Sequence, residues 1–309
     1  MRRLIPFLLL FVSISSFGQK KEICFTIDDL PFVNYGMSDT SFQKQALSDL
    51  VHSFTNHQIP AIGFVNGNKL YSNDSPNTFQ ISLLELWINN GLELGNHTYS
   101  HPDYNKVSYA EFTEDIMKGE QPTKQILESQ GMSMTYFRHP FLHTGDTQSK
   151  SDSLKSFLKT HQYIEAPVTI DNDDYLFALA YKRAYVKNDT TLMTRIGSAY
   201  ITYMEKKVLH FEKQAKGLFN RDIKQILLLH SSLLNSVYVD ALADMLIKNN
   251  YAFISLEEAL RDKAYNTEVN IYPEWGISWL DRWALSQNKP REFFLGEPDT
   301  PAFIKELAK

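Results

Sequence analysis

Two histidines with the spacing of metal ligands are the first chemical feature of the chain. His97 and His101 lie four positions apart, and on a helical turn this spacing would place both imidazoles on the same side. With 9 His among 309 residues, about one chain in four of this composition would hold such a pair by chance. Capping and surface hydrogen bonding are the alternative roles for the pair.

Two adjacent carboxylates, Asp28 and Asp29, directly follow the apolar run Ile23–Ile27. Two His and one Asp satisfy a divalent metal and leave a position open for water, as in a catalytic zinc site. Neighbouring residues on a strand point to opposite faces, so both aspartates can face one site only where the strand turns into a loop. One could then bind the metal while the other takes a proton from the water. The alternative is a simple loop start, since Asp is a common turn former.

A second histidine pair, His139 and His143, has the same spacing. For this pair we expect packing or substrate contact, with a metal pair as the remote alternative.

The one cysteine, Cys24, lies in an apolar run, so we interpret it as a buried packing residue rather than a nucleophile. A single cysteine also excludes an intrachain disulfide and a multi-cysteine metal site.

The elements that must position these residues alternate between strands and helices. Each of the seven expected strands is followed by a helix, which favours parallel pairing with right-handed crossovers and a closed or nearly closed barrel over an open doubly wound sheet. No Gly-rich phosphate loop follows any strand, which weakens a nucleotide-binding interpretation. The expected strands are 23–27, 61–65, 92–94, 134–137, 163–170, 226–229 and 251–254, and the expected helices are 39–57, 75–90, 109–130, 151–161, 237–249 and 256–263.

Polar clusters follow five of the expected strands. In an α/β barrel the carboxyl ends of the strands form one rim, and the chemistry is built there. Five clusters on one rim therefore predict a site. The clusters are Asp28-Asp29, 96–101, Arg138-His139-Pro140-Phe141, 171–174 and His230-Ser231-Ser232.

Composition and charge exclude several classes of protein. The chain is 43% hydrophobic and 13% aromatic, which excludes an intrinsically disordered protein and allows a sizeable core. The formal net charge of −5 gives no electrostatic case for binding nucleic acid or an anionic membrane surface.

The N-terminus has the pattern of a secretory signal peptide. Arg2 and Arg3 precede an apolar run, and Ser16 and Gly18 put small residues before a cleavage site. We therefore expect residues 1–18 to be removed and the mature protein to be secreted or periplasmic. An uncleaved membrane anchor is the alternative, although the apolar run is short for a span. No later stretch is long and apolar enough to cross a membrane.

The ordered motifs resemble those of the polysaccharide deacetylases (NodB-homology domain, carbohydrate esterase family 4). The resemblance extends from about residue 23 to residue 260 and is most specific in the aspartate pair and the H-[ST]-x-x-H motif. It implies an α/β fold, a distorted (β/α)7 barrel with a helical insertion between strands 5 and 6 and a C-terminal extension. The motifs are 26–29, 97–101, 138–141, 171–175 and 227–230.

The resemblance also implies roles for individual residues. Asp29, His97 and His101 would hold the metal, Zn²⁺ or another divalent transition metal. Asp28 would be the base that activates a metal-bound water, and His230 the acid that protonates the leaving amine. Arg138 would orient Asp28, and Asp174 would steady His230. The backbone N–H of Phe141 would stabilise the oxyanion, and Tyr175 and His143 would contact the substrate.

The chain departs from the family pattern in several places. Ser231 stands after His230 where an Asp is usual, and Tyr175 stands where a Trp is common. We expect residues 19–264 to form the catalytic domain, including a helical insertion at about 176–217, and residues 265–309 to form an aromatic-rich extension. Within the extension a tryptophan recurs at every fourth position, at Trp275, Trp279 and Trp283. This spacing favours a helical face that packs into the core. An aromatic sugar-binding platform or a lid is the alternative.

The function that the resemblance implies is removal of acetyl groups from an N-acetylated or O-acetylated glycan. A catalytically silent glycan-binding protein on the same fold is the alternative. Two His and one Asp also suit non-haem iron oxygenases, and Asp28 with Asp171 or Asp174 could serve a glycosidase. The sequence itself does not identify the glycan.

Overall fold

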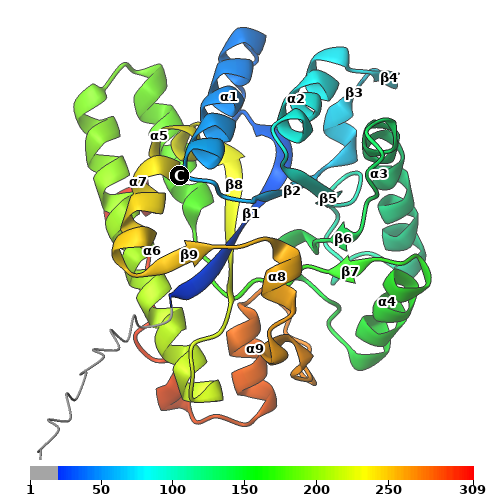
Figure 1. Cartoon of the computed structure of the whole chain (residues 1–309), viewed down its shortest axis with the longest axis vertical. Helices are drawn as coiled ribbons and strands as arrows, with labels where there is room; N and C mark the ends of the chain where they lie inside the picture. The colour runs from blue at the N-terminus through cyan, green and yellow to red at the C-terminus, as the bar shows by residue number, and fades with distance from the viewer. Residues whose placement is uncertain (1–19) are drawn as a thin grey trace, which may run out of the picture.

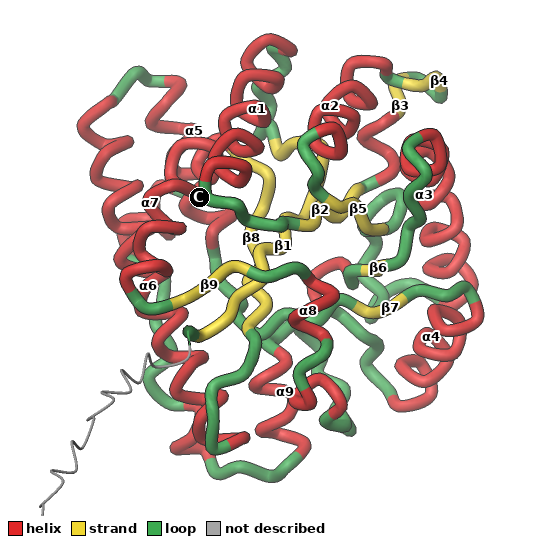
Figure 2. The backbone as a smooth tube through the Cα atoms, in the orientation of Figure 1, coloured by secondary structure: helices red, strands yellow, loops and turns green. Residues whose placement is uncertain are grey.

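The computed structural model describes residues 20–309, so the expected signal peptide lies outside the described residues. Figures 1 and 2 show a curled sheet at the centre of the molecule with helices around it. All of its pairings are parallel, in the order β7-β6-β5-β2-β1-β8, with β9 on β1. Its strands are β1 (Lys21–Val33), β2 (Ile62–Val65), β5 (Glu93–Asn96), β6 (Tyr136–Phe137), β7 (Ile164–Glu165), β8 (Gln225–Ser232) and β9 (Tyr251–Phe253).

The central strand β1 holds the sheet together. It pairs with β8 from Ile23 onward, in a register that sets Asp28 opposite His230, and with β2 from Thr26. Its apolar side chains are buried, as a strand covered on both faces requires, except for the half-buried Val33 at its end. Cys24 is among them, free and buried, and burial raises the pKa of its thiol. This agrees with the packing role expected for it.

The ring of strands closes through a single bridge. Residues 163–170 were expected to form one strand, but only Ile164 and Glu165 do so, on the β6 side. Three residues after Pro167, which has no N–H to donate to a ladder, Ile170 pairs with β8: its N–H donates to Ile226 O at 3.0 Å. The prediction of an α/β fold with a nearly closed parallel barrel is confirmed.

Helices cover the outside of the sheet. Three of them begin at other residues than expected, and one of these starts at Gln148 instead of residue 151. Ser75-Pro76 forms strand β4, paired with β3 (Tyr71–Ser72), and Asn77 caps the next helix instead by accepting from Gln80 N–H at 3.2 Å. Ser232 likewise starts its helix before the expected residue 237. The helices are α1 (Thr40–Asn56), α2 (Thr78–Asn89), α3 (Tyr109–Ser129), α4 (Gln148–Thr160), α7 (Leu233–Lys248) and α8 (Leu256–Leu260).

The helical insertion consists of two antiparallel helices, α5 (Asp174–Val186) and α6 (Thr190–Phe219), which lie beside α7 in Figure 1. Close approach between α6 and α7 depends on Gly197, because a Cβ there would lie 1.8 Å from Tyr238 Cζ. Tyr200 on α6 is buried and reaches toward the rim of the barrel, where its OH donates to Asn235.

The C-terminal extension packs against the barrel through α9 (Trp279–Ser286) and ends in α10 (Ala302–Leu307) beside α5 (Figure 1). Trp283 is buried and Trp279 is half-buried, so the expected packed face holds for these two. Trp275 precedes the N-cap of α9 and is 66% exposed, so it does not belong to that face. Among the helices of residues 20–309, none has the length and hydropathy of a membrane span.

The close approach at Gly197 predicts a stability effect. Gly197→Ala should lower the free energy of unfolding by about 1–3 kcal/mol, because the added methyl group must displace the ring of Tyr238. Urea unfolding followed by circular dichroism measures this. The exposed neighbour Ser198→Ala serves as the control, with a change within about 0.5 kcal/mol; equal stabilities for the two variants would contradict the packing described for α6 and α7.

Candidate metal centre and active site

A cavity of about 530 Å³ opens at the carboxyl ends of the strands. Carboxylates of β1 and imidazoles of β8 and of the loop after β5 form one part of its lining. Aromatic and apolar groups from the surrounding loops form the other part. The predicted rim site and this cavity therefore coincide. The lining residues are Asp28, Asp29, Val33, Tyr35, His97, His101, Phe141, Leu142, Asp171, Asn172, Asp173, Tyr175, Leu228, His230 and Gly276.

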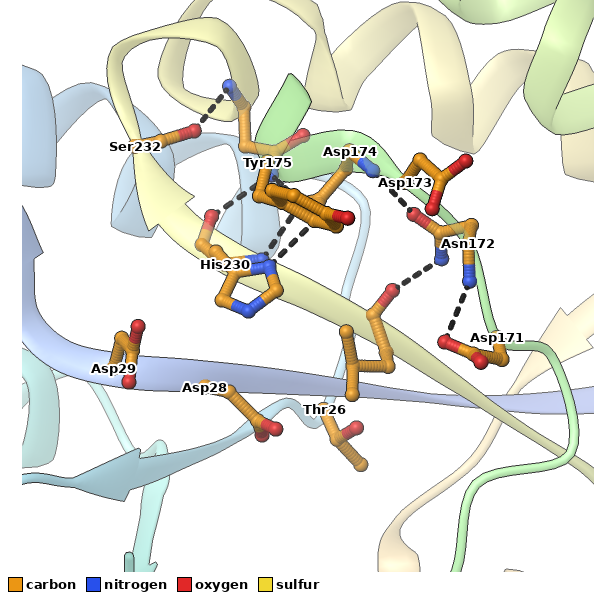
Figure 3. A network of polar contacts seen from close by, with 12 residues as sticks. Thr26, Asp28, Asp29, Asp171, Asn172, Asp173, Asp174, Tyr175, His230 and Ser232 are labelled. Atoms are coloured by element: carbon orange, nitrogen blue, oxygen red, sulfur yellow. Dashed lines mark hydrogen bonds and ion pairs between the residues drawn. The ribbon is translucent and has the colours of Figure 1, made fainter. Parts of the chain in front are cut away.

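The aspartate pair lies at an irregularity inside β1, and not at its end as expected. The strand continues to Val33, but the pairing of β1 with both neighbours shifts register after Ile27 and Asp28. Asp29 has a φ of 66°, which breaks the alternation of side chains along the strand. Both carboxylates line the same cavity as a result (Figure 3).

His97 and His101 converge through an irregular loop, so the helical turn expected for them is wrong. Thr98 and His101 both have positive φ. The loop is held by side chains: Asn96 Oδ1 accepts from Thr98 N–H at 2.7 Å, and Thr98 Oγ1 accepts from His101 N–H at 3.0 Å. The two rings meet edge to face with centroids 4.7 Å apart.

Three ligand atoms lie in position to share one ion. Asp29 Oδ1 is 3.8 Å from both His97 Nε2 and His101 Nε2, and this oxygen is buried without a hydrogen-bond partner in the described part of the chain. His97 Nδ1 donates to Arg138 O at 2.8 Å, which leaves the lone pair on Nε2 facing the cluster. The set of one carboxylate and two imidazoles fits a divalent transition metal such as zinc.

The protonation states also suit metal binding. Burial lowers the pKa of both His97 and His101 to about 4, so at neutral pH both imidazoles are neutral. Burial by itself would raise the pKa of Asp29, but Lys69 and the nearby imidazoles outweigh it and hold that pKa well below the usual range. An ionised carboxylate and two neutral rings are the forms that a metal binds.

Asp28 lies beside this cluster with its own partly unsatisfied carboxylate. Its Oδ2 is 3.8 Å from Arg138 Nη1 and from His97 Nε2, and no group among residues 20–309 bonds its buried Oδ1. Burial raises the pKa of Asp28, and the charge of Arg138 opposes that rise. Arg138 itself donates to Thr26 Oγ1 at 2.8 Å, so it neighbours Asp28 without a direct hydrogen bond.

His230 is held by a chain of buried hydrogen bonds (Figure 3). Its Nδ1 donates to Asp174 Oδ1 at 2.6 Å, and Asp174 Oδ2 accepts from the backbone N–H of His230 and from Asn235 Nδ2, each at 2.8 Å. Burial lowers the pKa of His230, but Asp174 outweighs that effect and raises it to about 9. The ring is therefore protonated at neutral pH, with Nδ1 fixed on Asp174.

Three residues of this neighbourhood were not singled out from the sequence. Asn235 Oδ1 accepts from Tyr200 OH at 2.7 Å, which links the helical insertion to His230. Lys69 Nζ donates to Asp29 O at 2.5 Å. Lys69 follows β2 and so lies on the same rim as the other clusters, a signal that could have found it. Asn235 and Tyr200 lie inside helices and carry no such signal.

The remaining predicted residues divide into two groups. Phe141 and Tyr175 line the cavity and are 53% and 46% exposed, with Tyr175 beside the imidazole of His230 in Figure 3. His143 does not line the cavity. Its Nδ1 donates instead to Asp103 Oδ1 at 2.5 Å. His139 is buried with Nε2 2.7 Å from Glu165 Oε1, so the second histidine pair does not converge on one point.

Known proteins share both sequence and fold with this chain. Residues 17–156 match the family model described as polysaccharide deacetylase. A peptidoglycan-N-acetylglucosamine deacetylase of Bacillus cereus is 27% identical over 139 residues, which are 45% of this chain and 43% of that protein. The Bacillus subtilis protein YlxY, described as uncharacterized, is 26% identical over 112 residues, 36% of this chain and 32% of its own. The alignments thus cover less than half of each of these relatives.

The similar solved structures include an enzyme and a protein described as a pseudoenzyme. The Bc1960 peptidoglycan N-acetylglucosamine deacetylase superposes with a TM-score of 0.51 and 19% identity over 78% of this chain and 88% of its own. A family 4 carbohydrate esterase pseudoenzyme from Bacillus anthracis superposes with a TM-score of 0.51. Its sequence identity is 17%, and the match covers 78% of this chain and 66% of that protein's chain. At this identity the structures establish the fold. Together with the match over residues 17–156, which is less than half of the chain, they confirm the resemblance to polysaccharide deacetylases predicted from the motifs.

Proposed function

We propose that the protein is a metal-dependent hydrolase that removes acetyl groups from an N-acetylated glycan, with acetyl esters as a second substrate type. The observation that carries the proposal is the convergence of Asp29, His97 and His101 in one cavity with Asp28 and His230. A ligand set alone would suit several chemistries. A neighbouring base and a protonated imidazole are the additional groups that amide hydrolysis needs.

The metal would supply Lewis-acid chemistry at the cavity, polarising the acetyl carbonyl and lowering the pKa of water. Asp28 accepts the proton of the attacking water, a role favoured by the burial that raises the pKa of its carboxyl. His230 then donates its Nε2 proton to the leaving amine as the carbon–nitrogen bond breaks. Asp174 keeps the imidazole oriented and charged, and the products are acetate and the free amine.

The surrounding groups would position the substrate. The backbone N–H of Phe141 would stabilise the oxyanion, and Tyr175 would form a wall beside the sugar. Arg138 would set the orientation of Asp28 from 3.8 Å away. Peptidoglycan-type N-acetylglucosamine is the substrate we favour, because the Bacillus cereus relative is named for it. Export by the N-terminal segment 1–18 would bring the protein to such a polymer.

A catalytically silent glycan-binding protein is the second candidate. The similarity to a structure described as a pseudoenzyme favours it, since the fold is evidently compatible with loss of activity. Against it stands the complete set of ligand, base and acid side chains in this cavity. Buried carboxylates and imidazoles without compensating partners are costly to keep together.

The ligand assignment predicts that binding of metal and activity fail together. Asp29→Ala, His97→Ala or His101→Ala should lose the ion and deacetylation, because each removes one of three ligands. Asp28→Asn should keep the ion and lower kcat by about 10²–10⁴-fold, because it removes only the base. Elemental analysis of the purified proteins and acetate release measure the two effects.

The exposed His52→Ala on α1 is the matched control, expected to keep both metal and activity. Full metal content in all three ligand variants would contradict the assignment.

The contact between Asp174 and His230 predicts a change in pH dependence. The carboxylate raises the pKa of His230 to about 9, so Asp174→Asn should lower that pKa, and the acid form should be lost at lower pH. The alkaline limb of the kcat profile should move to lower pH by about one unit or more.

Asp49→Asn makes the same chemical change on the exposed face of α1 and should leave the profile unchanged. An unshifted alkaline limb in Asp174→Asn would rule out His230 as the acid.

A further inference from the structure

A strongly exposed tryptophan lies next to the cavity. Trp275 is 66% exposed, more than any other large hydrophobic side chain in residues 20–309. The next residue, Gly276, lines the cavity together with Phe141 and Tyr175, which are also exposed aromatic side chains. Two exposed rings therefore line the cavity, and the residue next to its lining carries a third.

Glycine at position 276 brings this segment against the rim. A Cβ at Gly276 would lie 1.9 Å from Phe141 O, so no other residue fits there without moving the backbone. The backbone of the extension thus touches the loop that carries Phe141. The backbone of Trp275 is consequently held one residue from the cavity lining.

Hydrogen bonds to the rim loops fix the segment in place. On one side, Asn105 Nδ2 donates to Pro273 O at 3.3 Å and Glu274 O at 3.0 Å. On the other, Ser278 Oγ donates to Thr169 O and Trp279 N–H donates to Val168 O, each at 2.7 Å. Further along, Arg282 Nη2 donates to Leu142 O at 2.7 Å. The exposed ring therefore sits on an anchored backbone.

We propose that Trp275 forms a second sugar subsite, so that the preferred substrate is an N-acylated oligosaccharide that spans the cavity and this ring. The inference rests on the proposed function, which places the sugar ring that loses its acetyl group in the cavity. An exposed indole offers a flat apolar face of the kind that sugar C–H groups cover, while the hydroxyl groups stay in water.

The test compares a short and a long substrate. For each variant, kcat/KM is measured on N-acetylglucosamine and on its tetramer, and the tetramer-to-monomer ratio is taken. Trp275→Ala should lower this ratio about tenfold through KM for the tetramer, and Trp275→Tyr should restore most of it because an aromatic face remains. Leu295→Ala, also in the extension and 59% exposed, should keep the ratio of the unmodified chain.

A binding measurement separates this inference from the proposed function. Calorimetric titration of the tetramer, in an Asp28→Asn background that prevents turnover, reports affinity without acetate release. Weaker tetramer binding in Trp275→Ala than in Leu295→Ala supports the subsite, whether or not acetate is released. If that weaker binding is seen but no acetate is released, the proposed function is contradicted and the subsite is not. Equal affinity in the two variants, or no tetramer binding to the parent protein, overturns the subsite even if acetate release is intact.

Discussion

The site depends on one constraint, that two adjacent aspartates on the central strand face the same cavity. A regular strand would send Asp28 and Asp29 to opposite faces. The register shift of β1 and the positive φ of Asp29 remove that alternation. Because β1 pairs with β2 and β8, this local irregularity sits at the centre of the sheet. His230 then approaches from the adjacent strand β8, and the two histidines from the loop after β5, which lies beyond β2.

Compensation of buried charge organises the rest of the rim. On the His230 side, Asp174 is fully buried, and its oxygens are satisfied by the imidazole, by a backbone N–H and by Asn235. On the metal side, Asp29 Oδ1 and Asp28 Oδ1 have no bonding partner among the described residues. A buried polar atom left without a partner is costly. The contrast between a satisfied half and an unsatisfied half is what a site completed by an ion and a substrate would show.

Much of this arrangement could be predicted from the sequence, because strand ends and polar clusters follow local rules. The alternation of strands and helices indicated a parallel barrel, and the polar residues after the strands indicated the rim. Local rules failed where tertiary contacts decide the backbone. The loop of His97 is shaped by Asn96 and by α3, where a Cβ at Gly119 would lie 2.4 Å from the carbonyl carbon of Thr98.

The irregularity inside β1 likewise had no signal in the aspartate pair itself. Asn235 and Tyr200 belong to helices whose patterns describe packing, so nothing in their spacing indicates a link to His230. Trp275 could be identified as one of three regularly spaced tryptophans, but its spacing suggested a buried helical face. Only the position of Gly276 against Phe141 places the backbone of Trp275 next to the cavity lining.

Acetate release from N-acetylglucosamine oligomers, with and without a chelator and then with added zinc, tests the central claim most directly. The account predicts that the chelator abolishes release and that zinc restores it, because Asp29, His97 and His101 would hold the ion on which the proposed hydrolysis depends. Release that is unaffected by complete removal of metal would contradict the account, and so would a protein that binds no metal at all.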